Sequence, residues 1–390
     1  MAPFYTVPDV QTSPSVHVPG RVRTDRVRTE RLGTGTVASV RALTYAGFGL
    51  APEVTEVADP IAPPGGAIVR VAASGLCRSD WHGWMGHDPD ITSFPHVPGH
   101  EFAGVVEAVG ESIDRSWVGR AVTAPFVMAC GRCAVCRAGE GQVCPHQRQP
   151  GFSDPGSFAE LVTVHAADTN LVALPDDVDP GTAAALGCRV ATAYRAVISR
   201  AGVTDGDAVV VLGCGGVGLA AIAIAVSLGA RVCAVDIDAG ALSRATGLGA
   251  EAVIDGRGAE ADVVRAVFDW SDGGASVSID ALGSPSTCRT GMLSLARRGR
   301  HVQVGLLPPA AGHAEVPMER VIGWELDVLG SHGMAAHDYP ALLAEVGSGR
   351  LDLGQLLAPG APLDLRAAGA ALAAMGGTPS RGIVLVDPSR

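Results

Sequence analysis

Hydrophobic and polar residues along the chain change their pattern twice. From about Val40, short β-rich runs alternate with Gly and Pro, namely VRALTY, AIVRVAASGLC, EFAGVVEAVG, AVTAP and FAELVTVH. This pattern predicts a strand-rich, partly antiparallel domain. From about Thr182, a helical stretch is followed by strands that alternate with helices, beginning with the strand AVVVLG and the helix LAAIAIAVSLG. Such βα alternation predicts an α/β fold with a parallel, doubly wound sheet.

The ends of the chain suggest how these parts are connected. Residues 329–390 return to mixed structure and end in the strand RGIVLVD. We therefore expect a cofactor domain of residues 189–328, inserted into a discontinuous first domain of residues 38–188 and 329–390. Residues 1–37 carry scattered prolines and arginines without a helical or strand period. They are interpreted as a flexible extension or an arm on a neighbouring subunit, and a basic binding patch is the alternative.

Composition and charge exclude several classes of function. Hydrophobic residues make up 47% of the chain, enough for a sizeable core, and the formal net charge is −11. That charge argues against nucleic acid or an anionic membrane as the main partner. No run of 18 apolar residues is present, and the N-terminus lacks the basic start and apolar region of a secretory signal. The expected location is the cytoplasm, where the nine cysteines favour metal binding or catalysis over disulfides.

Four of the cysteines form one cluster in the sequence. Cys130, Cys133, Cys136 and Cys144 follow the spacing C-x2-C-x2-C-x7-C. Short loops of this kind allow four thiolates to close on one tetrahedral zinc, which leaves no open position and indicates a structural site. The alternatives are an iron–sulfur cluster or four unrelated buried cysteines.

Three further segments carry residue types typical of a catalytic zinc site. They are Cys77 in CRSDWH, His100 in GHEFAG and Cys188 in LGCRVATA. Two cysteines and a histidine give three protein ligands and leave a fourth position for water or substrate. Each segment alone is ambiguous, because single cysteines are often only small buried side chains. Whether the three converge is a question of the fold.

A glycine-rich turn predicts a dinucleotide site. Gly213, Gly215, Gly216, Val217 and Gly218 lie in GCGGVG, directly after the strand AVVVL and before an apolar helix. Glycines there allow the backbone to approach a pyrophosphate at the helix N-terminus. Asp236 ends the next strand, 18 residues past Gly218, where a carboxylate can bind the ribose hydroxyls. No Arg or Lys follows it directly, so we expect NAD over NADP. The alternative is an acid that only caps the next turn.

These motifs together resemble those of the zinc-dependent alcohol dehydrogenases of the medium-chain dehydrogenase/reductase superfamily. The stretch from Gly99 to Ile113 fits the family signature G-H-E-x2-G-x5-G-x2-I, and the four-cysteine spacing matches without a gap. The resemblance extends from about Val40 to Pro388. It implies a GroES-like, mostly-β catalytic domain with a zinc lobe at about 126–146, and a Rossmann NAD-binding domain. It also implies two zincs per chain and reversible hydride transfer between NAD(H) and an alcohol, aldehyde or ketone bound at zinc.

The resemblance also assigns roles to individual residues. Cys77, His100 and Cys188 would bind the catalytic zinc, Glu101 would be an alternate ligand or lie beside it, and Asp80 would orient the histidine. Ser79 and His82 would relay the proton to solvent. For the cofactor, Arg78 and Arg381 resemble arginines that bind the pyrophosphate, and Thr192 resembles the residue near the nicotinamide. The family's basic residue after the ribose-binding acid is absent, since Ala241 stands there.

The substrate pocket and the assembly are less clearly encoded. Phe126 resembles a pocket-wall residue, and Trp84, Leu306, Val328 and His332 are candidate lining, each with ordinary packing as the alternative. His337 lies in the same loop as His332, and no role is assigned to it. The short segment between Cys144 and Cys188 resembles that of tetrameric microbial enzymes, so we expect a homotetramer rather than a dimer.

Two other functions remain open at this point. One is reduction of a conjugated C=C or C=N bond, which the presence of Ser79, His82 and three zinc ligands disfavours. The other is a zinc-stabilised NAD-binding protein without catalysis. A three-ligand metal site beside a hydride cofactor would have no evident use in such a protein.

Overall fold

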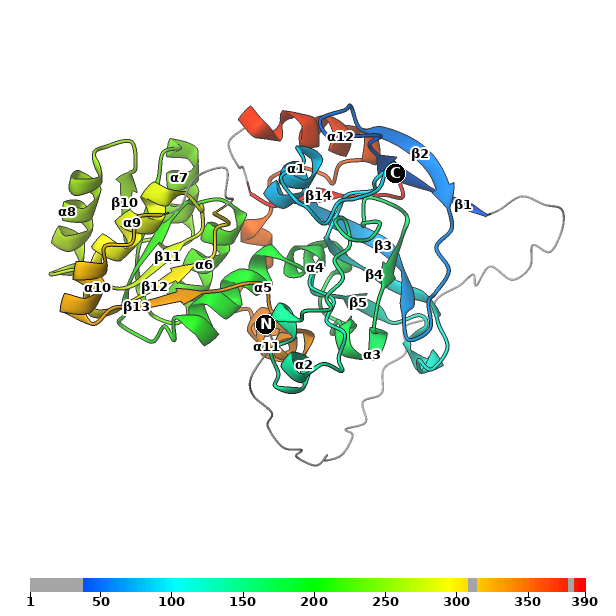
Figure 1. The fold of residues 1–390 in the computed structure, drawn as a ribbon, viewed down its shortest axis with the longest axis horizontal. Helices are drawn as coiled ribbons and strands as arrows, with labels where there is room; N and C mark the ends of the chain where they lie inside the picture. Colours follow the sequence, from blue (N-terminus) through cyan, green and yellow to red (C-terminus); the bar gives the residue numbers. More distant parts are fainter. Residues whose placement is uncertain (1–37, 308–313, 378–381) are drawn as a thin grey trace, which may run out of the picture. The chain divides into compact units, whose positions relative to one another are not determined.

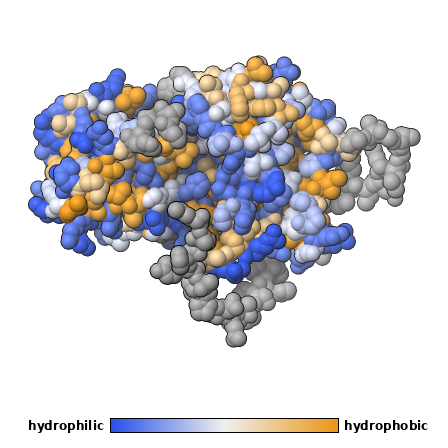
Figure 2. All heavy atoms as spheres, viewed as in Figure 1, coloured by the Kyte–Doolittle hydropathy of each residue, from blue (hydrophilic) through white to orange (hydrophobic). Residues whose placement is uncertain are grey.

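The computed structural model describes residues 38–307, 314–377 and 382–390. The predicted extension 1–37 and Arg381 lie outside these residues. Within the described residues, no helix combines the length and apolar character needed to cross a membrane. On the face drawn in Figure 2, hydrophilic and hydrophobic residues are interspersed.

The first domain is built on an antiparallel sheet, as the alternating β-rich runs predict. Its strand order is β14-β3-β4-β5-β7, with β6 also paired to β3, and a separate hairpin joins β1 to β2. The strands are β1 (Ser39–Thr44), β2 (Glu53–Ala58), β3 (Ala67–Leu76), β4 (Glu101–Val109), β5 (Ala121–Thr123), β6 (Leu161–Val164), β7 (Val172–Ala173) and β14 (Val384–Val386).

The C-terminal segment completes this sheet. β14 pairs with β3 along its last residues, Val384 opposite Leu76 and Val386 opposite Ser74 (Figure 1). The sheet therefore uses strands from both ends of the described chain, with the second sheet's strands between them in sequence. This arrangement is the discontinuous first domain that the order of the elements predicts, and it is the GroES-like domain that the family resemblance implies.

The second sheet is parallel throughout, in the order β10-β9-β8-β11-β12-β13. Its strands are β8 (Ala208–Leu212), β9 (Arg231–Asp236), β10 (Ala252–Asp255), β11 (Ala275–Asp280), β12 (Leu295–Gln303) and β13 (Asp327–Gly330). Strands with near-continuous hydrophobic residues are expected in such a sheet, because helices cover both faces. The GroES-like and Rossmann-like fold class is thus confirmed. The predicted domain boundary at residue 329 falls within β13.

Helices connect the strands and position the two candidate sites. The principal ones are α1 (Arg78–Trp84), α5 (Arg189–Tyr194), α6 (Gly216–Ser227), α7 (Ala239–Gly247), α8 (Glu260–Ser271), α9 (Pro285–Leu293), α10 (Met318–Trp324), α11 (Tyr339–Gly347) and α12 (Leu365–Ala374). The shorter ones include α2 (Ala134–Arg137), α3 (Ala167–Asn170), α4 (Pro180–Ala183) and the π-helical η4 (Arg195–Arg200). Residues of α5 and α6 share one buried hydrophobic cluster, which also includes residues of both sheets.

The order of the parallel strands determines where a ligand can bind. β8 lies between β9 and β11, so the chain runs outward in one direction through β9 and β10 and then returns to the other side of β8 at β11. Ligands of such sheets bind at the carboxyl ends of the strands on either side of this reversal. The glycine turn that follows β8 is located there, beside Asp236 at the end of β9.

Candidate active site

Three predicted ligands converge in the structure. Cys77 follows β3 as the N-cap of α1, His100 directly precedes β4, and Cys188 is the N-cap of α5. One ligand atom from each lies within 4.8 Å of the others, and all three residues are buried. Adjacent antiparallel strands bring Cys77 close to His100, and the connection to α5 adds Cys188. The set matches the three-ligand arrangement of a catalytic zinc.

Asp80 fixes the orientation of His100. Its Oδ2 accepts a hydrogen bond from the Cys77 backbone N–H at 2.9 Å, and its Oδ1 accepts from Gly99 N–H at 3.1 Å. The same Oδ1 lies 2.9 Å from His100 Nδ1, so a proton on Nδ1 is donated to Asp80. The other ring nitrogen, Nε2, is buried with no hydrogen-bond partner. A metal ion is the partner that such a nitrogen fits, because an imidazole whose Nδ1–H is bound presents its Nε2 lone pair.

The thiols support the same assignment. A hydrogen bond from Cys188 holds the pKa of Cys77 well below its ordinary value, while the same interaction and burial raise the pKa of Cys188 well above it. For His100, burial lowers the pKa, but Asp80 and Cys77 together outweigh burial and raise the pKa well above the ordinary value. A bound cation would favour the thiolates and the neutral imidazole, so cation binding should release protons.

Ser79 and His82 lie on α1 next to this cluster. The Ser79 hydroxyl is 3.8 Å from the Cys77 sulfur. His82 is half-buried, and its Nδ1 lies 3.0 Å from Nδ1 of the exposed His87. Burial, followed by the charges of Arg78 and His87, lowers the pKa of His82. The pair thus leads from the half-buried imidazole to an exposed one, and His87 is a residue that the sequence analysis did not identify.

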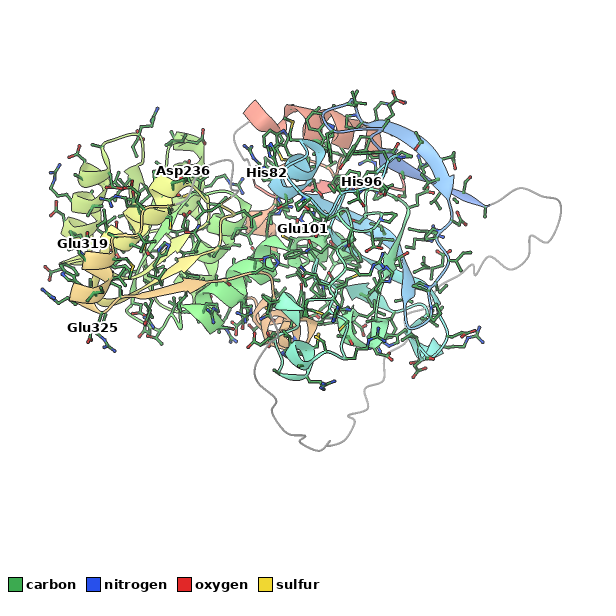
Figure 3. All side chains as sticks on the ribbon, viewed as in Figure 1. His82, His96, Glu101, Asp236, Glu319 and Glu325 are labelled. Atoms are coloured by element: carbon green, nitrogen blue, oxygen red, sulfur yellow. The ribbon has the colours of Figure 1, made fainter. Side chains whose placement is uncertain are left out.

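Glu101 has a partner that the sequence analysis did not identify. Its Oε1 accepts hydrogen bonds from the Arg189 backbone N–H at 2.6 Å and from Nε at 3.0 Å. Its Oε2 accepts from Nε at 2.8 Å and from the terminal Nη2. Both carboxylate oxygens are therefore engaged by Arg189 in this structure. Figure 3 shows Glu101 where β4 begins.

The four-cysteine cluster also converges. The sulfurs of Cys130, Cys133, Cys136 and Cys144 lie within 4.8 Å of one another. Backbone N–H groups donate to these sulfurs, from Cys136 to Cys133 at 3.4 Å and from His146 to Cys144 at 3.3 Å. The Arg132 N–H is the main cause that lowers the pKa of Cys130 to about 6. Burial, by contrast, raises the pKa of Cys136 to about 12. Backbone N–H donors favour thiolates, and four thiolates suit a closed tetrahedral zinc site.

The glycine turn shows why glycine occupies particular positions. Gly213 has φ of +90°, which favours glycine. A Cβ on Gly218 would lie 1.8 Å from the Gly213 carbonyl oxygen, so the first turn of α6 packs directly on the strand end. A Cβ on Gly215, by contrast, would meet nothing within 4 Å. The open side at Gly215 and the N-terminus of α6 together fit the backbone cradle of a dinucleotide pyrophosphate.

Asp236 lies against this turn, at the end of β9 (Figure 3). Its Oδ2 accepts from the Cys214 N–H at 2.6 Å, and its Oδ1 accepts from the Asp238 N–H at 2.9 Å. Asp238 caps α7, and Asp255 is the cross-strand partner of Asp236. Asp255 is paired with Arg257, Nη2 to Oδ2 at 2.7 Å. The turn and the predicted ribose site are therefore lined by carboxylates.

The remaining cofactor residues lie in different surroundings. The Thr192 hydroxyl on α5 is buried with no hydrogen-bond partner, so it is free to bind a ligand group. Arg78 donates to the Met375 carbonyl at 2.8 Å and packs over the Trp81 ring at 4.6 Å. Arg381 lies outside the described residues.

The predicted pocket residues divide into two groups. Phe126 packs edge-on against His100, with ring centroids 6.1 Å apart, and against His332 at 5.3 Å. Phe152, which the sequence analysis did not identify, packs on His100 at 5.2 Å. Among the other candidates, Trp84 lies in the buried cluster with Leu43, whereas Leu306 and Val328 are exposed, so their pocket role stays a prediction. His337 is exposed and pairs with Asp338.

Family comparisons agree with both halves of the structure. Residues 63–176 match the family model for the alcohol dehydrogenase GroES-like domain. Residues 216–348 match the family model for the zinc-binding dehydrogenases. The first match contains the four-cysteine cluster and two of the predicted catalytic ligands, and the second begins in the glycine turn.

Individual relatives are similar over most of their length. An alcohol dehydrogenase of Geobacillus stearothermophilus is 34% identical over 260 residues, which is 66% of this chain and 75% of the relative. The alcohol dehydrogenase TADH of Thermus sp. ATN1 superposes with a TM-score of 0.80 at 31% identity, covering 89% of this chain and 99% of that one. A zinc-binding dehydrogenase of Sinorhizobium meliloti 1021, bound to NADP, gives a TM-score of 0.79 at 26% identity, with coverage of 90% and 100%.

Proposed function

Since the chain belongs to the zinc-dependent alcohol dehydrogenases of the medium-chain dehydrogenase/reductase superfamily, we propose that it transfers hydride reversibly between an alcohol and NAD. The observation that carries this proposal is the convergence of Cys77, His100 and Cys188 around the unpartnered Nε2 of His100. The glycine turn is close to this cluster. Arg189 directly follows Cys188, and its Cδ would lie only 2.4 Å from a Cβ placed on Gly216.

We assign the metal-holding role to these three side chains. A zinc ion held there would act as a Lewis acid and lower the pKa of a bound alcohol. Asp80 keeps the Nδ1 proton on His100 and also holds the Cys77 N–H, so one carboxylate orients two ligands. The four-cysteine cluster is proposed as a second, structural zinc site.

The proton of the alcohol needs a route to solvent. Ser79 is placed beside Cys77 and can accept a hydroxyl proton while donating its own. His82, on the same helix, is proposed to take that proton and pass it toward the exposed His87, which lies 3.0 Å away. A base with a lowered pKa is neutral at neutral pH and able to accept a proton.

The carboxylates around the ribose site support NAD as the cofactor. A bound nicotinamide ring would supply the hydride acceptor. Asp236 can accept hydrogen bonds from ribose hydroxyls, and a 2′-phosphate there would face the charges of Asp236 and Asp238. Because one relative binds NADP, the preference is a proposal for this chain and not a family property.

For the substrate we propose only a class of alcohol, and for the assembly only the number of subunits. Phe126, Phe152 and His332 form an aromatic wall next to His100, which favours an alcohol with an apolar carbon group. The homotetramer stays a prediction from the short segment between Cys144 and Cys188, and the mass of the protein in solution tests it.

Replacement of one proposed ligand tests the function. In Cys77→Ala, turnover of any alcohol that the wild type oxidises should be abolished, while NADH binding, followed by fluorescence, should persist. Cys233→Ala is the matched control, because Cys233 is equally buried in β9 and belongs to neither cysteine cluster. Normal turnover in Cys77→Ala would refute the ligand assignment. Loss of turnover in the Cys233→Ala control would show that the effect is not specific to the metal site.

A further inference from the structure

The buried ion pair of Arg189 and Glu101 lies between the two proposed sites and has no part in the steps above. Glu101 follows the ligand His100, and Arg189 follows the ligand Cys188. Among the described residues, Arg189 is the one arginine that is buried, at 5% exposure, and Glu101 is fully buried. A buried charge pair is expensive to desolvate, so its position next to both sites calls for an explanation beyond stability.

One end of the pair controls a carboxylate beside the metal ligands. Arg189 donates to both oxygens of Glu101 through its backbone N–H, Nε and Nη2, with the Nε contacts at 3.0 and 2.8 Å. This is a planar fork matched to a carboxylate, which a lysine could not reproduce. Carboxylates are themselves zinc ligands. While the fork holds, neither oxygen of Glu101 is available for a metal ion.

The other end of the pair contacts the glycine turn. A Cβ on Gly216 would lie 2.4 Å from Arg189 Cδ and 3.4 Å from Nη1, the one terminal nitrogen that does not donate to Glu101. On the opposite side, a Cβ on Gly75 would lie 2.3 Å from Glu101 Oε2. The pair thus fills the space between the end of β3 and the first turn of α6. Gly216 opens α6, where a pyrophosphate would sit.

We propose that Arg189 is a positioning residue that holds Glu101 off the catalytic metal and transmits occupancy of the glycine turn to the metal site. An anionic pyrophosphate at the turn would attract Nη1 and draw the guanidinium toward α6, which would loosen the fork on Glu101. By reciprocity, a metal site that requires the fork would weaken binding at the turn by the same factor by which binding at the turn weakens the fork. The inference rests on the proposed function, because it assumes a catalytic zinc and a dinucleotide.

The visible spectrum of cobalt-substituted protein gives a readout independent of turnover. Cobalt replaces zinc in such sites, and its spectrum depends on the ligand set. In the wild type, NADH should shift the spectrum. In Arg189→Met, the spectrum without NADH should already differ, because Glu101 has lost its partner and can approach the metal, and the NADH-induced shift should be lost.

Two further variants separate the two halves of the proposal. In the double variant Glu101→Gln/Arg189→Met, the spectrum without NADH should return to that of the wild type, because no carboxylate remains, while the response to NADH stays absent. Arg189→Lys keeps the positive charge, so the protein should fold even if the methionine variant does not. It should still lose the NADH-induced shift, because an ammonium cannot form the fork.

The control is Arg195→Met, which removes an arginine six residues further along the chain that pairs with Glu140 at 2.8 Å. It should leave the spectrum and its NADH response unchanged. Wild-type spectra and responses in both Arg189→Lys and Arg189→Met would overturn the inference. Failure of the proposed function is separate: it would appear as wild-type protein that oxidises no alcohol, whatever the spectra of the variants.

Discussion

Asp80 is the residue on which the geometry of the proposed metal-ligand cluster depends. One carboxylate holds the Cys77 N–H, the Gly99 N–H and the Nδ1 proton of His100, so the end of β3 and the start of β4 are tied to the same group. Without this carboxylate, neither the tautomer of His100 nor the orientation of its ring would be fixed. Partners of this kind are important because they determine which ligand atom is presented and how basic it is.

His82 gives a prediction on the pH dependence. Burial and Arg78 lower its pKa, so the imidazole stays neutral, and able to accept a proton, to a pH below the ordinary value for histidine. The decline of kcat/KM on the acid side should therefore have its midpoint at a pH below the ordinary pKa of histidine. In His82→Gln, kcat should drop on the order of 10²-fold and recover with added imidazole. His337→Gln, at an exposed histidine, is the control. An unchanged pH profile in His82→Gln would remove His82 from the relay.

Asp236 gives a prediction on cofactor preference. Its carboxylate is the group proposed to accept from the ribose, a charged hydrogen bond typically worth about 1.5–3 kcal/mol. Asp236→Ala should therefore narrow the ratio of kcat/KM for NAD over NADP by about 10- to 100-fold. Asp262→Ala on α8 removes an exposed acid that pairs with Arg265, and should leave the ratio unchanged. A wild-type ratio in Asp236→Ala would contradict the ribose role.

Residue types predicted the metal and cofactor candidates, but not the contacts between distant residues. The spacing of the cysteines and the glycine motif are local in sequence and could be recognised directly. Arg189 and Phe152 could not be found in that way. Arg189 contacts Glu101 from 88 positions away, and no periodicity marks an arginine that will be buried. The only available signal was its position next to Cys188.

At the scale of elements, long buried strands were predicted better than short or exposed ones. The strand that was predicted to end at Asp236 is β9, which does end there, and four of its six residues are buried hydrophobics in a parallel sheet. β2 and β13 were not predicted. Their residues are mostly exposed or half-buried, so they lack the run or alternation that marks a strand. The helical stretch predicted from about Thr182 is divided in the structure into α4, a 3₁₀ turn, α5 and the π-helical η4, which residue propensities do not distinguish.

The four-cysteine lobe gives a prediction at this scale. It contains only short helical segments and loops, so its shape should depend on the metal it is proposed to bind. Cys133→Ser should reduce the zinc content from about two to about one per chain and lower the thermal midpoint by on the order of 5 °C or more. Metal analysis and calorimetry measure both. Two zincs retained together with an unchanged midpoint would show that the lobe is not a metal site.

At the scale of the whole molecule, the two candidate sites are built from different sheets. The proposed metal ligands come from the ends of antiparallel strands and the start of α5, and the glycine turn comes from the reversal point of the parallel sheet. Residues of both sheets share one buried hydrophobic cluster with α5 and α6, and this shared core fixes the position of one site relative to the other. The order of elements in the sequence was sufficient to predict the two sheets. It could not predict how closely Arg189 would approach Gly216.

Alcohol oxidation by the wild-type chain is the decisive test of the proposed function. NADH or NADPH formation is followed with a panel of primary, secondary, allylic and benzylic alcohols, with NAD and NADP in parallel, before and after treatment with a zinc chelator. The account predicts turnover with NAD, little with NADP, loss on chelation and recovery when zinc is returned. Full zinc content with no oxidation of any alcohol, or turnover that a chelator does not affect, would contradict it.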